Sequence, residues 1–230
     1  MYEVKTIVAR HPGLALPIAR RRHGVPVGPG TELVIEGFPR TGTSFAVAAF
    51  HMTQPRSVSV ASHVHAPAQV IEAMHAGIPA LVVIREPEET ILSFVIRNPH
   101  IAPRQALRGY LRFYEPLAPR RSGFAVADFR EITTDFGAVT AGLNRRFGTS
   151  FAEFDHTDEN VRACFAEIDG DYRGRVAGDA FERSVARPSK AREEMKVALR
   201  DRYRHSAPDL RERAERVYAA LVASNHAGNR

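Results

Sequence analysis

The feature that most constrains the fold is a glycine-containing loop, Gly37 to Ser44, set between an apolar strand and a helix. We predict the strand over Thr31–Glu36 and the helix over Phe45–Met52. Glycines at such a junction let backbone N–H groups approach an anion closely, and the N-terminus of the helix adds partial positive charge. The chain is therefore expected to contain a strand–loop–helix unit that binds a phosphate-like group.

Apolar strands and helices continue to alternate beyond this unit. Further strands are predicted over Ser57–Ser62, Pro79–Ile84 and Gly123–Phe129. Further helices are predicted over Pro67–His75, Glu88–Arg97, Pro103–Leu117 and Glu131–Phe147. The run from Pro79 to Ile84 is continuously apolar, as in strands that are buried on both faces of a parallel sheet. This alternation predicts a single α/β domain with a central parallel sheet flanked by helices.

The 230 residues are enough for one domain with a sizeable core. We interpret residues 1–30 as an N-terminal extension with a weak helical pattern and residues 31–147 as the α/β core. Residues 148–187 change in character and are interpreted as a variable region that could form a lid or one wall of a second binding site. Residues 188–230 are rich in charged, helix-forming sequence and are expected to pack on the core as a helical segment.

The chain is basic, with a formal net charge of +6 and Arg strongly preferred over Lys. Nucleic acid, an anionic membrane surface or a multiply charged small ligand would each suit this balance. Arginine favours planar, bidentate recognition of phosphate-like groups, although the Ala- and Arg-rich composition is also typical of many bacterial proteins. A single cysteine, Cys164, excludes an intrachain disulfide and a cysteine-based metal cage. With no predicted transmembrane segment or secretion signal, a cytoplasmic location is expected.

The glycine loop differs from the nucleoside-triphosphatase pattern GxxxxGK[ST] at its most important cation. The glycine spacing matches, but Thr43 stands at the lysine position, and the cation of this loop is Arg40, which comes earlier in the sequence. The loop therefore predicts an anion cradle arranged for a different phosphorylated ligand. The alternative is a tight turn whose glycines serve geometry alone.

The run from Pro39 to Phe45 resembles the P-[KR]-[ST]-G-[ST]-[ST]-aromatic loop of the PAPS-dependent sulfotransferases. These enzymes use 3′-phosphoadenosine 5′-phosphosulfate (PAPS) as donor. The resemblance implies a topology like that of the P-loop nucleoside-triphosphate hydrolases. It also implies that Arg40 polarises the bridging and sulfuryl oxygens and that Phe45 lies near the adenine. The donor-binding residues that it implies in this loop are Arg40, Thr41, Gly42, Thr43, Ser44 and Phe45.

A second part of the signature follows the next buried strand. Arg85 comes directly after Leu81–Ile84, and Ser93 lies eight residues later. In the family, an Arg and a Ser at this spacing hold the 3′-phosphate of the donor. Arg85 would leave the carboxyl end of a strand, where ligands of open α/β sheets bind. The alternative is that Arg85 forms only a local cap or salt bridge.

The C-terminal half gives a further basic segment. Residues Arg187, Ser189 and Arg192 resemble the segment that covers the nucleotide in bacterial members of the family. The resemblance implies that they contact the donor as well. It covers about residues 31–147 well and the remainder of the chain poorly.

Two histidines at the end of the second strand are candidates for the catalytic base. His63 follows Ser62 where the family has its base, and His65 is a second candidate. Histidine suits proton transfer near neutral pH. The alternatives are a hydrogen-bonded structural histidine or a metal site, but no third ligand stands near the pair, so no metal is expected.

These features together predict an enzyme that transfers a sulfuryl group from PAPS to a hydroxyl group and releases PAP. The acceptor is expected to be a small molecule, a carbohydrate or a lipid-linked metabolite, and no nucleic-acid partner is expected. One alternative is a P-loop kinase or NTPase; another is a non-catalytic anion-binding protein of the same fold. The sequence gives no indication of an oligomeric state.

Overall fold

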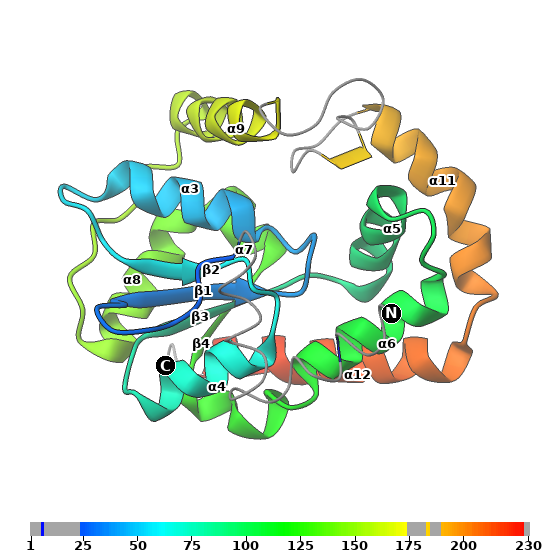
Figure 1. Cartoon of the computed structure of the whole chain (residues 1–230), viewed down its shortest axis with the longest axis horizontal. Helices are drawn as coiled ribbons and strands as arrows, with labels where there is room; N and C mark the ends of the chain where they lie inside the picture. The colour runs from blue at the N-terminus through cyan, green and yellow to red at the C-terminus, as the bar shows by residue number, and fades with distance from the viewer. Residues whose placement is uncertain (1–5, 7–23, 174–182, 185–189, 228–230) are drawn as a thin grey trace.

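The computed structural model describes residue 6 and residues 24–173, 183–184 and 190–227. Its centre is a parallel sheet of four strands in the order β2-β1-β3-β4 (Figure 1). The strands are β1 (Leu33–Gly37), β2 (Val60–Ser62), β3 (Ala80–Ile84) and β4 (Ala125–Asp128). Strand β1 pairs in parallel with β2 on one side and β3 on the other. The predicted α/β class with a parallel sheet is confirmed.

Helices cover both faces of this sheet (Figure 1). The first face carries α4 (Pro67–His75), α5 (Pro87–Arg97), α6 (Pro103–Tyr114) and α12 (Pro208–Ala227). The second face carries α3 (Thr43–Thr53), α7 (Phe129–Thr134) and α8 (Phe136–Phe147), and α9 (Asp158–Arg173) packs on the outer side of α3 (Figure 1). The short η1 (Ala118–Gly123) precedes β4, and α11 (Lys190–Arg204) packs beside α5. The strand–helix alternation predicted from the sequence is therefore the actual order of the core.

The two faces of β3 explain its continuous apolar sequence. Side chains of successive strand residues point to opposite faces of a sheet. Val82 and Ile84 therefore lie in the core beneath the first set of helices, whereas Leu81 and Val83 lie in the core beneath the second. Burying each of these side chains stabilises the fold by roughly 1.5–3 kcal/mol. The central strands thus form a rigid platform for the loops at their ends.

The helix predicted over Glu131–Phe147 is wrong in one respect: it is two helices that meet at Asp135. Helix α7 ends at Thr134, and Asp135 is the N-cap of α8, with a non-helical backbone whose φ is −157°. Its carboxylate accepts the backbone N–H of Ala138 at 2.9 Å. Aspartate favours such a cap over a helix interior because its short side chain bonds the nearby backbone. This local bond interrupts an apolar pattern that is otherwise continuous.

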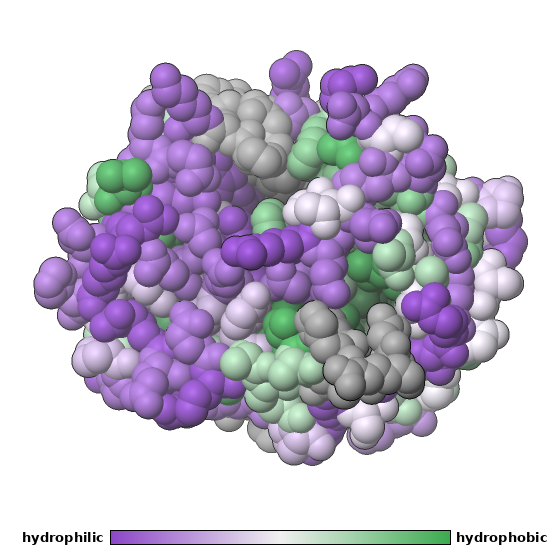
Figure 2. Space-filling view, turned by 180° about the vertical axis from the view of Figure 1, so that it is seen from behind, coloured by the Kyte–Doolittle hydropathy of each residue, from purple (hydrophilic) through white to green (hydrophobic). Residues whose placement is uncertain are grey.

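The C-terminal helices pack against the first face of the sheet. Leu210, Ala214 and Leu221 of α12 are buried in that core, and α12 lies along α6. The face of the molecule seen in Figure 2 is largely hydrophilic, with its apolar areas broken up by polar side chains. Within the described residues, no helix combines the length and the apolar composition needed to cross a lipid bilayer.

Two glycines of α8 give a matched test of how closely this helix packs. A Cβ at Gly137 would lie 2.5 Å from the carbonyl oxygen of Phe154, whereas a Cβ at Gly142 would have only the end of the Arg145 side chain nearby, at 3.9 Å. We expect Gly137→Ala to lower the free energy of unfolding by about 1–3 kcal/mol through overpacking. Gly142→Ala should raise it by about 0.5–1 kcal/mol. Urea denaturation of both variants checks this, and changes of the same sign would contradict it.

Candidate functional site

The two predicted anion-binding segments lie at one edge of the sheet. Strands β1 and β3 are parallel neighbours, so the loops after them leave the same carboxyl edge. The Nη1 atom of Arg85, after β3, lies 3.5 Å from the carbonyl oxygen of Arg40, in the loop after β1. That distance is at the long limit of a hydrogen bond. It nevertheless brings the two parts of the motif together at the end of the sheet.

The glycine loop has an unusual backbone conformation. Gly42 has a φ of 102° and directly precedes α3, while Arg40 has a φ of 77°. A non-glycine residue in the left-handed region costs roughly 1–2 kcal/mol. A Cβ at Gly42 would lie 3.0 Å from the ring of Phe129, so this position favours glycine for space as well as for φ. Strain of this kind is retained when the surrounding structure imposes it, often at a functional site.

Hydrogen bonds to Tyr114 and within the loop itself hold the glycine loop in place. The backbone N–H of Phe38 donates to the hydroxyl of Tyr114 on α6 at 3.1 Å, and that hydroxyl donates to the carbonyl of Val83 at 2.7 Å. Within the loop, the hydroxyl of Thr41 donates to the carbonyl of Phe38 at 2.7 Å. Tyr114 therefore ties the loop after β1 to strand β3.

Arg40 and Arg192 meet at the hydroxyl of Ser93. The Nε of Arg40 donates to Ser93 Oγ at 3.1 Å, and Nη2 of Arg192 donates to the same oxygen at 2.7 Å. Nη1 of Arg40 also donates to the carbonyl of Ser184 at 2.8 Å. The structure thus brings Ser93 to Arg40 and Arg192, two of the residues predicted to bind the donor.

The resulting cluster is strongly positive. Burial, followed by repulsion from Arg192, lowers the pKa of Arg40 to about 9, and Arg97 and Arg85 add to the repulsion. The guanidinium group of Arg40 remains charged at neutral pH. Arg192 is only 4% exposed. Several guanidinium groups held close together in a partly buried place favour the binding of an anion with more than one negative charge.

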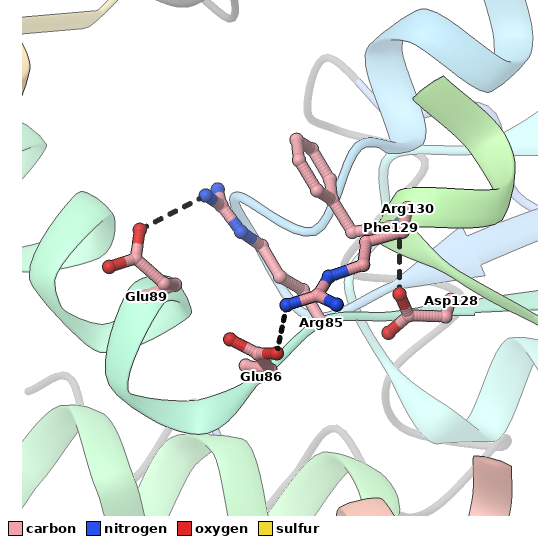
Figure 3. A pocket seen from close by; sticks show the side chains of 6 residues that line it. All are labelled: Arg85, Glu86, Glu89, Asp128, Phe129 and Arg130. Carbon is pink, nitrogen blue, oxygen red and sulfur yellow. Dashed lines mark hydrogen bonds and ion pairs between the residues drawn. The ribbon is translucent and has the colours of Figure 1, made fainter. Parts of the chain in front are cut away.

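Arg85 lines a pocket of about 220 Å³ beside this cluster (Figure 3). The pocket is lined by Arg85, Glu86, Glu89, Asp128, Phe129 and Arg130. The guanidinium carbon of Arg85 lies 4.0 Å from the centre of the Phe129 ring. Figure 3 shows Arg85 reaching along Phe129 toward Glu89, whereas Arg130 turns to Glu86. The ring therefore keeps Arg85 extended over the end of the sheet.

Glu89 is a residue of this site that the sequence analysis missed. Its carboxylate accepts Arg85 Nη2 at 3.2 Å, Lys196 Nζ at 2.7 Å and Arg200 Nη2 at 2.9 Å. Burial opposes its ionisation, but these three cations outweigh burial and lower its pKa. Lys196 and Arg200 belong to α11, the helix that also carries Arg192. Glu89 thus links α11 to the strand end that carries Arg85, and its place four residues after Arg85 is the sequence signal that could have indicated it.

The two histidines have different surroundings. Nε2 of His63 lies 3.3 Å from the hydroxyl of Ser44 in the glycine loop, and Nδ1 lies 2.9 Å from the hydroxyl of Ser62. Nδ1 of His65 donates to the carbonyl of Gly37 at 2.8 Å, and burial lowers the pKa of His65 to about 4. The structure therefore joins His63 to a side chain of the glycine loop and His65 to the backbone of that loop.

Phe45 lies in the second core. Its ring is 3% exposed and packs against Phe154, His156 and Phe165. Arg187 and Ser189, also predicted to contact the donor, lie outside the described residues. In the part of the chain that the structure describes, no three His, Cys, Asp or Glu side chains gather in a way that could hold a metal ion.

The hydroxyl of Thr43, at the lysine position of the nucleoside-triphosphatase pattern, is buried and finds no hydrogen-bond partner among the described residues. A buried hydroxyl without a partner costs about 1–3 kcal/mol. Replacing it by a methyl group in Thr43→Val should therefore leave the free energy of unfolding unchanged or raise it.

Thr41→Val in the same loop is the matched comparison. It removes the bond to the carbonyl of Phe38, so a loss of about 1 kcal/mol is expected. Urea denaturation without ligand checks both variants. An equal loss in the two variants would show that the hydroxyl of Thr43 is bonded in solution.

The chain matches no protein-family model and no curated protein. Among solved structures, the crystal structure of a mouse sulfotransferase complexed with PAP is similar at 11% sequence identity and a TM-score of 0.46, covering 88% of this chain and 93% of that chain. The basis for a function is therefore the geometry of this chain rather than this distant likeness.

Proposed function

We propose that the protein is a PAPS-dependent sulfotransferase that transfers a sulfuryl group to a hydroxyl of a small-molecule, carbohydrate or lipid-linked acceptor in the cytoplasm. The observation that carries this proposal is the convergence of Arg40 and Arg192 on the hydroxyl of Ser93, with Arg85 at the same sheet edge. These residues come from the glycine loop, α5, α11 and the end of β3. The motif that resembles the sulfotransferase loop is part of this cluster.

The arrangement suits a donor that is phosphorylated at both ends of its ribose. The glycine loop and Arg40 would hold the 5′-phosphosulfate, with backbone N–H groups at the start of α3 facing the phosphate. Arg85, Arg192 and Ser93 would hold the 3′-phosphate. Arginine offers a fixed fork of donors that matches phosphate oxygens, and serine adds a directional donor.

The reaction needs in-line geometry and one proton acceptor. The acceptor oxygen attacks the sulfur of the donor, and the bond between that sulfur and the oxygen of the 5′-phosphate breaks. PAP leaves with the electron pair of that bond, so negative charge grows on its phosphate oxygen. Arg40 would stabilise this charge, and the proton of the acceptor hydroxyl would pass to a base.

His63 is the proposed base. With the proton of the ring on Nδ1, donated to Ser62 Oγ at 2.9 Å, Nε2 has a lone pair that faces Ser44 Oγ at 3.3 Å. A donor phosphate that binds Ser44 would draw this hydroxyl away and leave Nε2 to the acceptor. The contact of His65 with the carbonyl of Gly37 supports a structural role for His65 instead.

Two other functions predict different ligands. A P-loop kinase or NTPase would bind ATP with Mg²⁺, and Thr43 at the lysine position disfavours this. A non-catalytic basic protein would bind a polyanion such as DNA with strong dependence on salt. Calorimetry of the full chain with PAP, with ATP and Mg²⁺, and with a short DNA duplex separates the three. Binding of PAP without Mg²⁺, followed by release of PAP from PAPS when hydroxyl acceptors are added, supports the sulfotransferase.

Arg85→Ala tests which phosphate this arginine holds. We expect the variant to weaken PAP binding by about 10- to 100-fold, because a hydrogen bond to a charged group contributes about 1.5–3 kcal/mol. Binding of AMP, which lacks the 3′-phosphate, should change by much less. Calorimetry with both nucleotides measures the difference.

Arg130→Ala is the matched control, because Arg130 lines the same pocket but forms an exposed ion pair with Glu86. It should change the affinity for PAP by less than about threefold, as expected for a surface pair. Equal losses of PAP and AMP binding in Arg85→Ala would contradict the assignment of Arg85 to the 3′-phosphate.

A further inference from the structure

Glu36 is a buried carboxyl group near the carboxyl end of a central strand. It belongs to β1, which lies between β2 and β3, and it directly precedes the glycine loop. Its side chain is 0% exposed. A buried carboxylate is costly unless hydrogen bonds replace the water that it loses. The partners that it has in this position therefore indicate what it does.

Four N–H groups surround this carboxylate. Oε1 accepts the backbone N–H of Val64 at 2.7 Å and the side-chain amide of Gln69 at 2.9 Å. Oε2 accepts the backbone N–H of Gly37 at 3.2 Å and that of His65 at 3.2 Å. Two of the four donors belong to the turn after β2, which carries both histidines. The carboxylate thus joins the glycine loop to this turn.

The turn after β2 is strained and needs such support. His63 has a φ of 60° and His65 a φ of 54°, both in the left-handed region. Each costs roughly 1–2 kcal/mol for a non-glycine residue. The N–H groups of Val64 and His65 converge on one carboxylate, as successive backbone amides do around a bound anion. The carboxylate of Glu36 takes the place of that anion and stabilises the strained backbone.

We propose that Glu36 is a positioning residue that holds the His63–His65 turn against the glycine loop and thereby places the His63 ring beside Ser44. The catalytic meaning of this placement rests on the proposed function, in which His63 accepts the proton. The structural claim, that the carboxylate of Glu36 fixes the His63 ring, can be tested without any donor or acceptor.

The carboxyl group of Glu36 changes its protonation state in a pH range that NMR can cover. Burial raises the pKa of Glu36 to about 8, although its four N–H partners act to lower this pKa. A proton on Oε2 would face the N–H groups of Gly37 and His65, so protonation weakens the hold on the turn. Of the titratable neighbours, His65 is neutral above its pKa of about 4, and burial raises the pKa of Tyr114, so this tyrosine stays protonated.

The test follows NMR signals between about pH 6 and about pH 10. In the wild type, the backbone amide signals of Val64 and His65 should shift together near pH 8, and the NOE contacts between the His63 ring and Ser44 should weaken as the pH falls through that value. Glu36→Gln places an amide where the protonated carboxyl would be. In this variant, the two amide signals should stay near the low-pH positions of the wild type, and the contact between the His63 ring and Ser44 should stay weak across the window.

Glu32→Gln is the control, because Glu32 precedes β1 at its other end and forms an exposed pair with Arg56. It should keep the transition. If Glu36→Gln does not fold, the wild type alone decides: a contact between the His63 ring and Ser44 that does not change with the two amide signals overturns the proposal. The proposal is also overturned if Glu36→Gln keeps the transition of the two amide signals near pH 8.

Ligand measurements separate this proposal from the proposed function. At about pH 9, where the carboxyl group of Glu36 is ionised in the wild type, Glu36→Gln should bind PAP within about threefold of the wild type and release PAP from PAPS at least tenfold more slowly, because placement of the base affects the chemical step rather than donor binding. Failure of the wild type to bind PAP would overturn the sulfotransferase assignment and leave the NMR result standing. Normal donor turnover by Glu36→Gln would overturn the catalytic part of the proposal.

The free energy of unfolding should also depend on the protonation of Glu36. Because the folded pKa of Glu36 lies above its ordinary value of 4.5, the folded state binds more protons between about pH 4.5 and about pH 8. The free energy of unfolding contributed by this group therefore falls as the pH rises through that window. Urea denaturation at about pH 6.5 and about pH 8.5, above the range in which His65 titrates, should show this fall in the wild type and a smaller one in Glu36→Gln.

Discussion

The repulsion among arginine side chains at the carboxyl edge of the sheet is the interaction on which the candidate site depends. Arg40 and Arg192 donate to one serine hydroxyl, and repulsion from Arg192, Arg97 and Arg85 opposes the charge of Arg40. Such a cluster is unfavourable by itself, and packing has to hold it together. A ligand with several negative charges would relieve the repulsion, and this is the basis on which the proposed function assigns a phosphorylated donor to the site.

The elements that hold this cluster are tied to the centre of the sheet. Tyr114 fixes the glycine loop to β3, and Glu36 fixes the turn that carries His63. Glu89 pairs with Arg85 and with two cations of α11, which brings Arg192 over the site. Each tie uses a buried or partly buried polar group with well-defined partners, so the loops meet in one arrangement.

The strands and the glycine loop could be predicted because their signals are local. A continuous apolar run indicated β3, and a short apolar run that ends at Glu36 indicated β1. The loop motif identified Arg40 to Ser44 directly. The break at Asp135 was missed because a single side-chain bond to Ala138 interrupts an otherwise helical pattern. Glu36 was missed because its neighbours in sequence are apolar, although a charged residue in such a strand is itself a signal of buried polar contacts.

The sequence by itself determined the order of strands and helices along the chain and the residue types of the glycine loop, since both depend on spacing along the chain. Only the tertiary structure decided which distant residues meet there. Ser93 lies with Arg40 and Arg192, Phe45 lies in the second core, and Glu36 lies under the His63–His65 turn. These contacts join residues far apart in sequence, and their geometry follows from how the helices pack on the two faces of the sheet, which local patterns do not encode.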